Sequence, residues 1–264
     1  MREPLKIGVI GANGWLGGAI VQALLNAGIT SPEHLVLSLR SGEPTRFPGA
    51  RWTRDNQDLA DSVDLIVVSV RPVDWPALNI EAAGRLIISV MAGIRLEQLV
   101  AGVGSDRVVR SLPNAAAEVR ASFTPWVASA AVSAEERRLV GRIFEACGTS
   151  AELESESELD YLTGLAGSGP AFPALLAVAM ARHAAAHGIE AKVARQAVTQ
   201  LLIGTGRLFE KNGYDPADTV EVFLDYRGTT AAAIEAMQAN GFDEAVGAGL
   251  AAAFRKSISM GLST

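Results

Sequence analysis

The stretch Lys6-Ile7-Gly8-Val9-Ile10-Gly11-Ala12-Asn13-Gly14-Trp15-Leu16-Gly17-Gly18 lies near the start of the chain and predicts a buried strand, a glycine turn and a helix that runs to about Ala27. Glycines allow the backbone to turn sharply, and the free N–H groups of a first helical turn attract phosphate. The stretch therefore predicts the diphosphate site of a dinucleotide, and hence a dinucleotide-binding fold.

The glycine spacing differs from the usual pattern for such a site. Gly11-x-x-Gly14-x-x-Gly17 has one more residue in the turn than G-x-G-x-x-G. A glycine-rich turn without a ligand therefore remains an alternative. The candidate cofactor contacts in the turn are Gly11, Ala12, Asn13, Gly14, Trp15 and Leu16.

The second expected strand, His34–Leu39, ends without the acidic residue that usually binds the ribose hydroxyls of NAD. Arg40 follows it, between Ser38 and Ser41. A guanidinium grips phosphate through paired hydrogen bonds, so this ending favours NADP(H) over NAD(H). A solvated loop arginine is the alternative.

Further strands are expected at residues 51–53, 64–70, 85–91, 108–110 and 123–128, with helices between them and another helix at 134–147. This alternation predicts an α/β fold with a doubly wound, mostly parallel sheet, whose ligands bind at the carboxyl ends of the strands. The candidate cofactor residues at those ends, together with Asn56, are Val70, Arg71, Pro72, Ala92, Gly93, Pro113 and Asn114.

Composition narrows the function classes. The chain has 264 residues, a net charge of −6 and no basic stripe, so nucleic-acid binding is not expected. Its single cysteine, Cys147, has no disulfide partner or metal-ligand spacing, and we expect no metal. We also expect no membrane span and no signal peptide, and a cytoplasmic protein.

The second half predicts only helices, after an acidic junction at 152–158. We expect a dinucleotide-binding domain at 1–155 and a helical domain at 156–264, with a break at Pro170 because proline lacks a backbone donor. The wide apolar faces of these helices would leave hydrophobic surface exposed in a monomer. The pattern therefore predicts a homodimer or higher homo-oligomer.

A second possible anion site lies at residues 225–234, Asp225-Tyr226-Arg227-Gly228-Thr229-Thr230-Ala231-Ala232-Ala233-Ile234. Gly228 permits a tight turn, and Thr229 or Thr230 is expected to cap the next helix. The N–H groups of that helix start would attract a carboxylate. A capped helix start that binds nothing is the alternative.

Together these motifs resemble the pyrroline-5-carboxylate reductase family. Residues 159–172, with Gly167-Ser168-Gly169-Pro170 inside them, are similar to the family's Ser-Gly-Ser-Gly-Pro-Ala-Tyr/Phe segment. Gly228-Thr229-Thr230 is similar to the end of its Ser-Pro-Gly-Gly-Thr-Thr loop, and residues 109–114 to its Arg-x-Met-Pro-Asn. The likeness covers essentially the whole chain, in order.

The resemblance implies hydride transfer from NAD(P)H to the imine carbon of pyrroline-5-carboxylate, giving proline. It implies that the substrate carboxylate lies on the amides of Gly228, Thr229 and Thr230. Thr230 would lie near the ring nitrogen, and Ser168 is the second candidate catalytic residue. The resemblance also implies Gly169 and Pro170 as substrate contacts. Arg227, which departs from the family, either reinforces the carboxylate site or folds away into solvent.

Two departures keep alternatives open. Asp225-Tyr226-Arg227 replaces the family's Ser-Pro-Gly, and Ala115-Ala116 replaces a Thr-Pro pair. A reductase of a different cyclic imine and a non-catalytic NADP-binding protein are therefore the alternatives. The absence of lysine from residues 159–187 argues against a β-hydroxyacid dehydrogenase.

Overall fold

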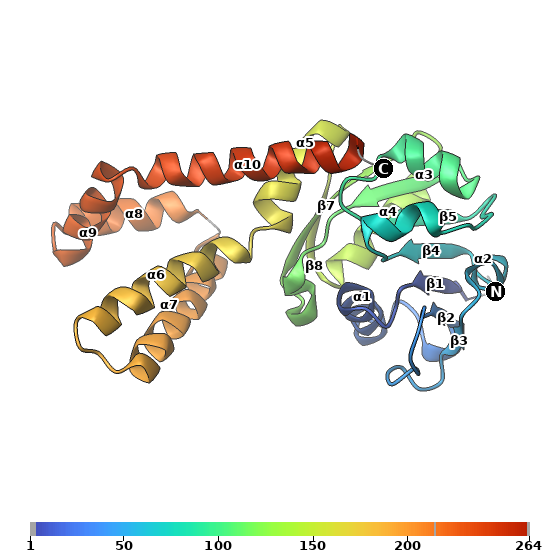
Figure 1. Cartoon of the computed structure of the whole chain (residues 1–264), viewed down its shortest axis with the longest axis horizontal. Coiled ribbons are helices and arrows are strands. Elements are labelled where there is room, and N and C mark those ends of the chain that lie inside the picture. Colours follow the sequence, from blue (N-terminus) through green and yellow to red (C-terminus); the bar gives the residue numbers. More distant parts are fainter. Residues whose placement is uncertain (1–3, 214, 263–264) are drawn as a thin grey trace. The chain divides into compact units, whose positions relative to one another are not determined.

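The computed structural model describes residues 4–213 and 215–262, which form two compact units (Figure 1). The first runs to Ser168 and also contains the end of the C-terminal helix from Ala252 onward. The second is Gly169–Ala251. A boundary between domains at 155 and 156 stays a prediction, because a compact unit need not fold alone.

The first unit is built on an eight-stranded sheet in the order β3-β2-β1-β4-β5-β6-β7-β8. All neighbouring pairs run parallel except β6 and β7. The strands are β1 Ile7–Ile10, β2 Leu35–Ser38, β3 Arg51–Thr53, β4 Leu65–Val68, β5 Leu86–Ser89, β6 Val108–Ser111, β7 Ser122–Ala128 and β8 Gly148–Glu152. The first six strands have the order of a Rossmann fold, which confirms the predicted fold class.

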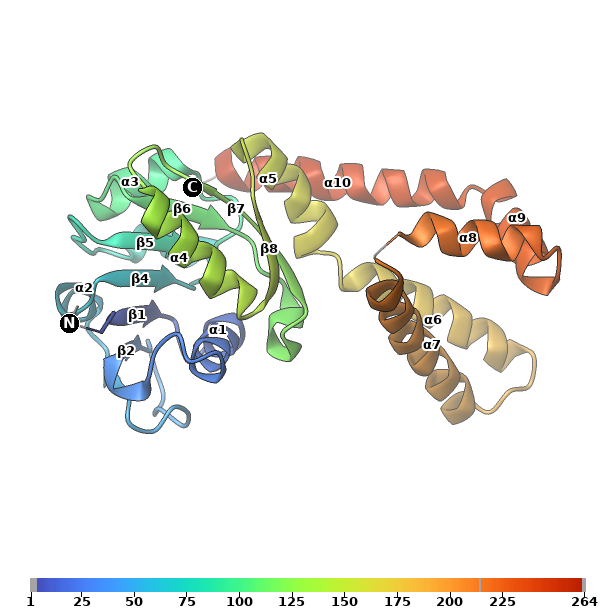
Figure 2. The same ribbon diagram turned by 180° about the vertical axis from the view of Figure 1, so that it is seen from behind.

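Helices cover both faces of this sheet (Figures 1 and 2). Alternate strand residues such as Val9 and Val67 pack with α1 Trp15–Asn26 and α4 Ala134–Glu145. Their neighbours, such as Ile10 and Ile66, pack with α2 Asn56–Ser62 and α3 Leu96–Val103. Burial on both faces explains why the central strands are continuous apolar runs.

One strand was not predicted. β8 has only polar and small residues, Gly148-Thr149-Ser150-Ala151-Glu152, and none of them is fully buried. It lies at the sheet edge, where only β7 pairs with it, so its sequence lacks the apolar signal of the central strands.

The chain leaves the sheet through α5 Glu156–Leu162, which continues into the π-helical segment Thr163–Gly167, labelled η4. A turn over residues 168–170 follows, and α6 begins at Ala171. The predicted break at Pro170 is therefore confirmed. Single π-helical turns inside helices occur mostly at functional sites.

The second unit is helical in the part of the chain that is described. Its helices are α6 Ala171–Ala186, α7 Ala191–Asn212, α8 Pro216–Asp225 and α9 Thr229–Ala239, with much of α10 Phe242–Leu262. α6 and α7 pack together, as do α8 and α9. Gly213 ends α7 in the left-handed conformation, with φ at 86°, as the expected glycine cap requires.

Residues 156–186 are long and apolar enough to cross a membrane by length and composition alone. The turn at residues 168–170 interrupts this run, and α6 itself has only 16 residues. A spanning helix needs about 20. The absence of a membrane partner stays a prediction.

Candidate active site

The glycine turn after β1 has the geometry that a dinucleotide site requires. Gly11 has φ at +83°, and a Cβ there would collide with the carbonyl oxygen of Ser69. A Cβ on Gly17 would collide with the carbonyl of Gly11, so Gly17 permits close packing of α1 on the turn. The Gly14 N–H donates to Gly11 O at 2.9 Å. The extra residue is thus absorbed in a hydrogen-bonded turn.

The start of α1 presents backbone donors. Its N-cap is Gly14, and no side chain caps the helix. The first N–H groups of a helix have no acceptor within the helix. Trp15, 63% exposed, opens the helix, and its indole Nε1 donates to Glu118 Oε2 at 2.8 Å. The tip of α1 therefore has the free backbone donors that an anion site requires, with an aromatic side chain held beside them.

Two arginines meet one carboxylate at the carboxyl ends of β2 and β4. Arg71 donates to Asp74 through Nε at 2.8 Å and Nη2 at 3.0 Å, and Arg40 Nη1 donates to Asp74 Oδ1 at 3.2 Å. The Arg71 hydrogen bond, with smaller contributions from the Arg71 and Arg40 charges, holds the pKa of Asp74 below 3.8. The cluster therefore has a net charge of +1 at neutral pH.

The serines that flank Arg40 differ in their surroundings. Ser38 is buried, and its hydroxyl donates to Asn56 Oδ1 at 2.8 Å. Asn56 is the first residue of α2, so this bond links the end of β2 to that helix. Ser41 is exposed. The structure thus joins Ser38 and Asn56, while Ser41 remains open to solvent next to Arg40.

The other predicted cofactor residues follow β4, β5 and β6. Val70, Pro72 and Ala92 are half-buried, and Gly93 and Pro113 are buried. Gly93 turns the chain after β5 with φ at +82°. All five lie at the carboxyl edge of the sheet, the same edge as the glycine turn.

Asn114 ties the end of β6 to the π-helical segment. Its Nδ2 donates to the carbonyl of Ala166 at 2.9 Å, and its Oδ1 accepts from the N–H of Ala116 at 2.9 Å. Ser168, just beyond that segment, is exposed, and its N–H donates to Thr163 O at 3.1 Å. Both polar groups of the Asn114 side chain are thus used within the chain. A cofactor contact by Asn114 stays a prediction.

The second candidate anion site belongs to the second unit. Gly228 is the N-cap of α9, and no side chain caps this helix. The expectation that Thr229 or Thr230 caps it is therefore wrong: both are helical residues that follow the N-cap, and neither side chain makes a capping hydrogen bond. Both threonines are exposed, as are their neighbours Tyr226 and Arg227. The amides that were expected to bind a carboxylate are free of a side-chain cap.

Arg227 adopts a conformation that favours glycine. Its φ is +50°, in the left-handed region. This residue stands where the family's Ser-Pro-Gly-Gly loop has a glycine, and in this chain an arginine adopts the left-handed conformation there at a conformational cost. The other predicted substrate contacts, Gly169 and Pro170, are half-buried and exposed respectively.

Sequence reasoning missed a buried ion network in the first unit. Arg110 in β6 is fully buried and donates to Asp160 Oδ1 at 2.6 Å and to Glu156 Oε1 at 2.9 Å. Arg95 Nη2 also donates to Asp160, at 3.3 Å. The acids lie about fifty residues beyond Arg110 in the chain, so no local motif could reveal them. The network fixes α5, and with it the start of the π-helical segment, to the sheet.

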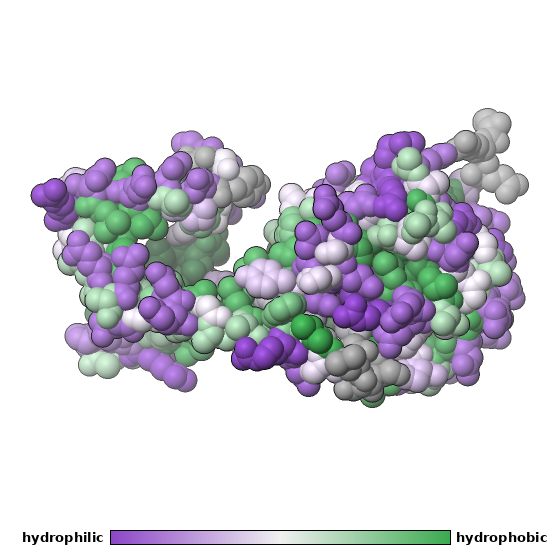
Figure 3. Space-filling model, turned by 90° about the horizontal axis from the view of Figure 1, so that it is seen from above, coloured by the Kyte–Doolittle hydropathy of each residue, from purple (hydrophilic) through white to green (hydrophobic). Residues whose placement is uncertain are grey.

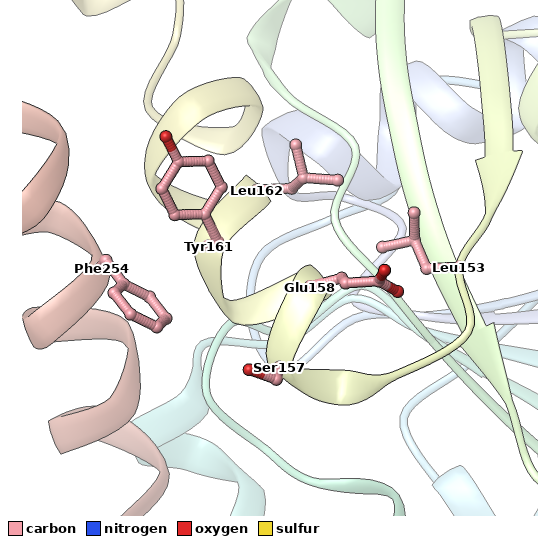
Figure 4. A pocket seen from close by; sticks show the side chains of 6 residues that line it. All are labelled: Leu153, Ser157, Glu158, Tyr161, Leu162 and Phe254. Carbon is pink, nitrogen blue, oxygen red and sulfur yellow. The ribbon is translucent and has the colours of Figure 1, made fainter.

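An apolar pocket of about 380 Å³ lies elsewhere in the same unit (Figure 4). It is lined by Leu153, Ser157, Glu158, Tyr161, Leu162 and Phe254. Tyr161 of α5 and Phe254 of α10 meet edge to face, with ring centroids 5.8 Å apart. No predicted cofactor or substrate residue lines this pocket. It belongs to the packing of α10 against α5.

Two family models match the chain. Residues 156–260 match "Pyrroline-5-carboxylate reductase dimerisation", and residues 6–93 match "NADP oxidoreductase coenzyme F420-dependent". Among curated relatives, pyrroline-5-carboxylate reductase 2 of Bacillus subtilis is 30% identical over 91% of this chain and 90% of its own length.

Solved structures agree with these matches. The pyrroline carboxylate reductase of Plasmodium falciparum, solved with NADP bound, has a TM-score of 0.82 and 25% identity, covering 99% of this chain and all of its own. The pyrroline-5-carboxylate reductase of Coxiella burnetii has a TM-score of 0.89 over 98% of this chain and 99% of its own; at 24% identity, it supports the fold. On the sequence match to the Bacillus relative, the chain belongs to the pyrroline-5-carboxylate reductase family.

Proposed function

We propose that this protein is an NADPH-dependent reductase that transfers hydride to the imine carbon of pyrroline-5-carboxylate and yields proline. The observation that carries the proposal is the carboxyl edge of the sheet. There, the uncapped start of α1 lies at the end of β1, and two arginines flank it at the ends of β2 and β4. The family membership supplies the imine chemistry.

The residues at this edge fit a nicotinamide dinucleotide. A side chain at Gly11 or Gly17 would fill the space next to the turn, and the free N–H groups of α1 suit a diphosphate. NADP rather than NAD is proposed because Arg40 stands where NAD-specific sites have an acid for the ribose hydroxyls, and Arg71, after β4, binds the same carboxylate as Arg40. The cofactor, when bound, supplies the hydride.

The chain's own contribution is binding and alignment. The amides of Gly228, Thr229 and Thr230, left free by the absent side-chain cap, suit a carboxylate, and the Thr230 hydroxyl is exposed for a contact with the ring nitrogen. Ser168 offers a second exposed hydroxyl. A protonated imine accepts hydride readily, so positioning is the main catalytic task.

We propose a homodimer, or a higher homo-oligomer, formed through the helical half. Only three apolar residues of the second unit are buried among those described: Ala194, Val198 and Ala231. Leu175 is 71% exposed, Leu208 53% and Val222 67%. Figure 3 shows hydrophobic residues, in green, at the surface of this unit. Such exposed apolar area is typical of a surface that another subunit covers. The cytoplasmic location also stays a prediction.

The activity test is NADPH oxidation in the presence of pyrroline-5-carboxylate, with proline measured as product. We expect turnover above the rate without substrate, and a loss of substrate affinity in Thr230→Val with unchanged NADPH binding. A protein that binds NADPH and yields no proline would refute the proposed substrate.

A different cyclic imine is the second candidate. Asp225, Tyr226 and Arg227 are all exposed next to the free amides of α9, and Tyr226 is 85% exposed. These side chains replace the small Ser-Pro-Gly of the family, so they alter the size and charge beside the proposed carboxylate site. A panel of five- and six-membered cyclic imines with and without a carboxylate distinguishes the two candidates.

A further inference from the structure

Asp74 is the residue on which the two arginines of the cofactor edge converge. It lies in η2 Pro72–Ala77, the next element after β4, and its side chain is about one third exposed. Arg71 holds both of its oxygens, at 2.8 and 3.0 Å, whereas Arg40 reaches only Oδ1, at 3.2 Å. Arg40 is therefore the more weakly held of the two cations, and its side chain is 77% exposed.

The position of this bridge matters for a bound dinucleotide. β1 lies between β2 and β4 in the sheet. Arg40 follows β2 by two residues, and Asp74 follows β4 by six, so the Arg40–Asp74 contact spans the carboxyl end of β1. The glycine turn and the start of α1 begin at that same end.

We propose that Asp74 sets the balance between NADPH and NADH. This inference rests on the proposed cofactor site. The Asp74 carboxylate competes with the ribose 2′-phosphate for Arg40, because both are anions that bind the same guanidinium. The same carboxylate can accept a hydrogen bond from the 2′-hydroxyl of NADH, as an acid does in NAD-specific sites. Asp74 thus weakens the preference that Arg40 and Arg71 create.

The charges give the direction of the effect. With Asp74 ionised, the three side chains sum to +1, and replacing it with asparagine raises the sum to +2. Asparagine also releases Arg40 from its ion pair while keeping the size of the side chain. Since the groups are exposed, the gain is that of a surface ion pair, about two- to fivefold in affinity at low salt.

The test measures binding of adenosine 2′,5′-bisphosphate and of AMP by calorimetry, which needs no turnover. We expect Asp74→Asn to tighten binding of the bisphosphate about two- to fivefold and to leave AMP binding unchanged or weaker. The gain should shrink in about 0.5 M salt, where exposed charges are screened. Asp74→Glu, which keeps the charge, should keep the parent's ratio of the two affinities.

Glu136→Gln is the matched control. Glu136 also pairs with an arginine, Arg107, but Arg107 immediately precedes β6 and so lies at the opposite edge of the sheet. Glutamine keeps the capping role of this residue at the start of α4. A change in the affinity ratio as large as that of Asp74→Asn would mean that net charge alone is responsible, and would overturn the inference.

Two further outcomes overturn it. An unchanged ratio in Asp74→Asn would mean that Asp74 does not compete for Arg40, and a weaker bisphosphate affinity would mean that Asp74 holds the arginines in the binding geometry. The proposed reaction is tested separately. If Asp74→Asn shows the expected affinity shifts but the parent protein forms no proline, the proposed substrate is refuted and the role of Asp74 stands.

Discussion

The Arg110–Asp160 ion pair allows a sharp prediction about stability. Arg110 is fully buried, with a side-chain solvent exposure of 0%, and that of Asp160 is 5%. The replacement Asp160→Asn keeps the size of the side chain but removes one of the two charges that neutralise Arg110 and Arg95. Two guanidiniums would then share Glu156 alone.

The magnitude follows from this geometry. Removing one partner of a buried ion pair typically costs about 3–5 kcal/mol, because the other charge stays buried without compensation. Glu156 remains 2.9 Å from Arg110 Nη1 and is 22% exposed, so part of the compensation survives. We therefore expect Asp160→Asn to lower the free energy of unfolding by about 3 kcal/mol, or the Tm by about 6–12 °C.

The assay is urea unfolding followed by tryptophan fluorescence, at one fixed protein concentration because oligomerisation contributes to stability. The double variant Arg110→Met with Asp160→Asn should be more stable than Asp160→Asn alone, since it removes the uncompensated cation. Glu43→Gln, which breaks an exposed pair with Arg54, should cost less than about 0.5 kcal/mol. A loss below about 1 kcal/mol in Asp160→Asn, or a double variant less stable than the single one, would refute the reasoning.

Three further predictions concern single positions. Gly11→Ala should weaken NADPH binding at least about tenfold, because φ at +83° and the Ser69 carbonyl leave no room for a Cβ. Fluorescence titration measures this affinity, and an unchanged value would contradict the role of the turn. Arg227→Gly should raise the free energy of unfolding by about 1 kcal/mol by relieving the left-handed φ, whereas Arg227→Ala, which keeps that strain, should give no gain in the same urea titration. Burial, only partly offset by the charge of Arg120, raises the pKa of Cys147 to about 11. A thiol reagent at pH 8 should therefore leave the native protein unlabelled and modify one thiol in urea. Rapid labelling of the native protein would show that this thiol is accessible.

The sequence predicted the fold where the signal is local. The apolar runs of β1, β4 and β5 report burial on both faces, and the glycines around Gly11 report a turn that only glycine allows. β8 was not predicted because an edge strand needs little apolar surface. The cap of α9 was assigned to a threonine because threonine is a common cap, whereas the chain reaches that position one residue earlier, at Gly228.

The side chains that the sequence did not reveal are those whose partners are set by topology. Nothing in the local sequence marks Asp74 as special. The strand order brings Arg40, thirty-four residues away in the chain, to the same carboxylate oxygen that Arg71 binds. Arg110 places a charge inside a buried strand, which is costly unless the charge is paired. Its partners, two acids of α5, are known only from the structure. In both cases the role of a charged residue depends on a partner that lies on a different element. A variant series in this family should therefore change such partners together, because a single change reports the cost of the charge that is left behind.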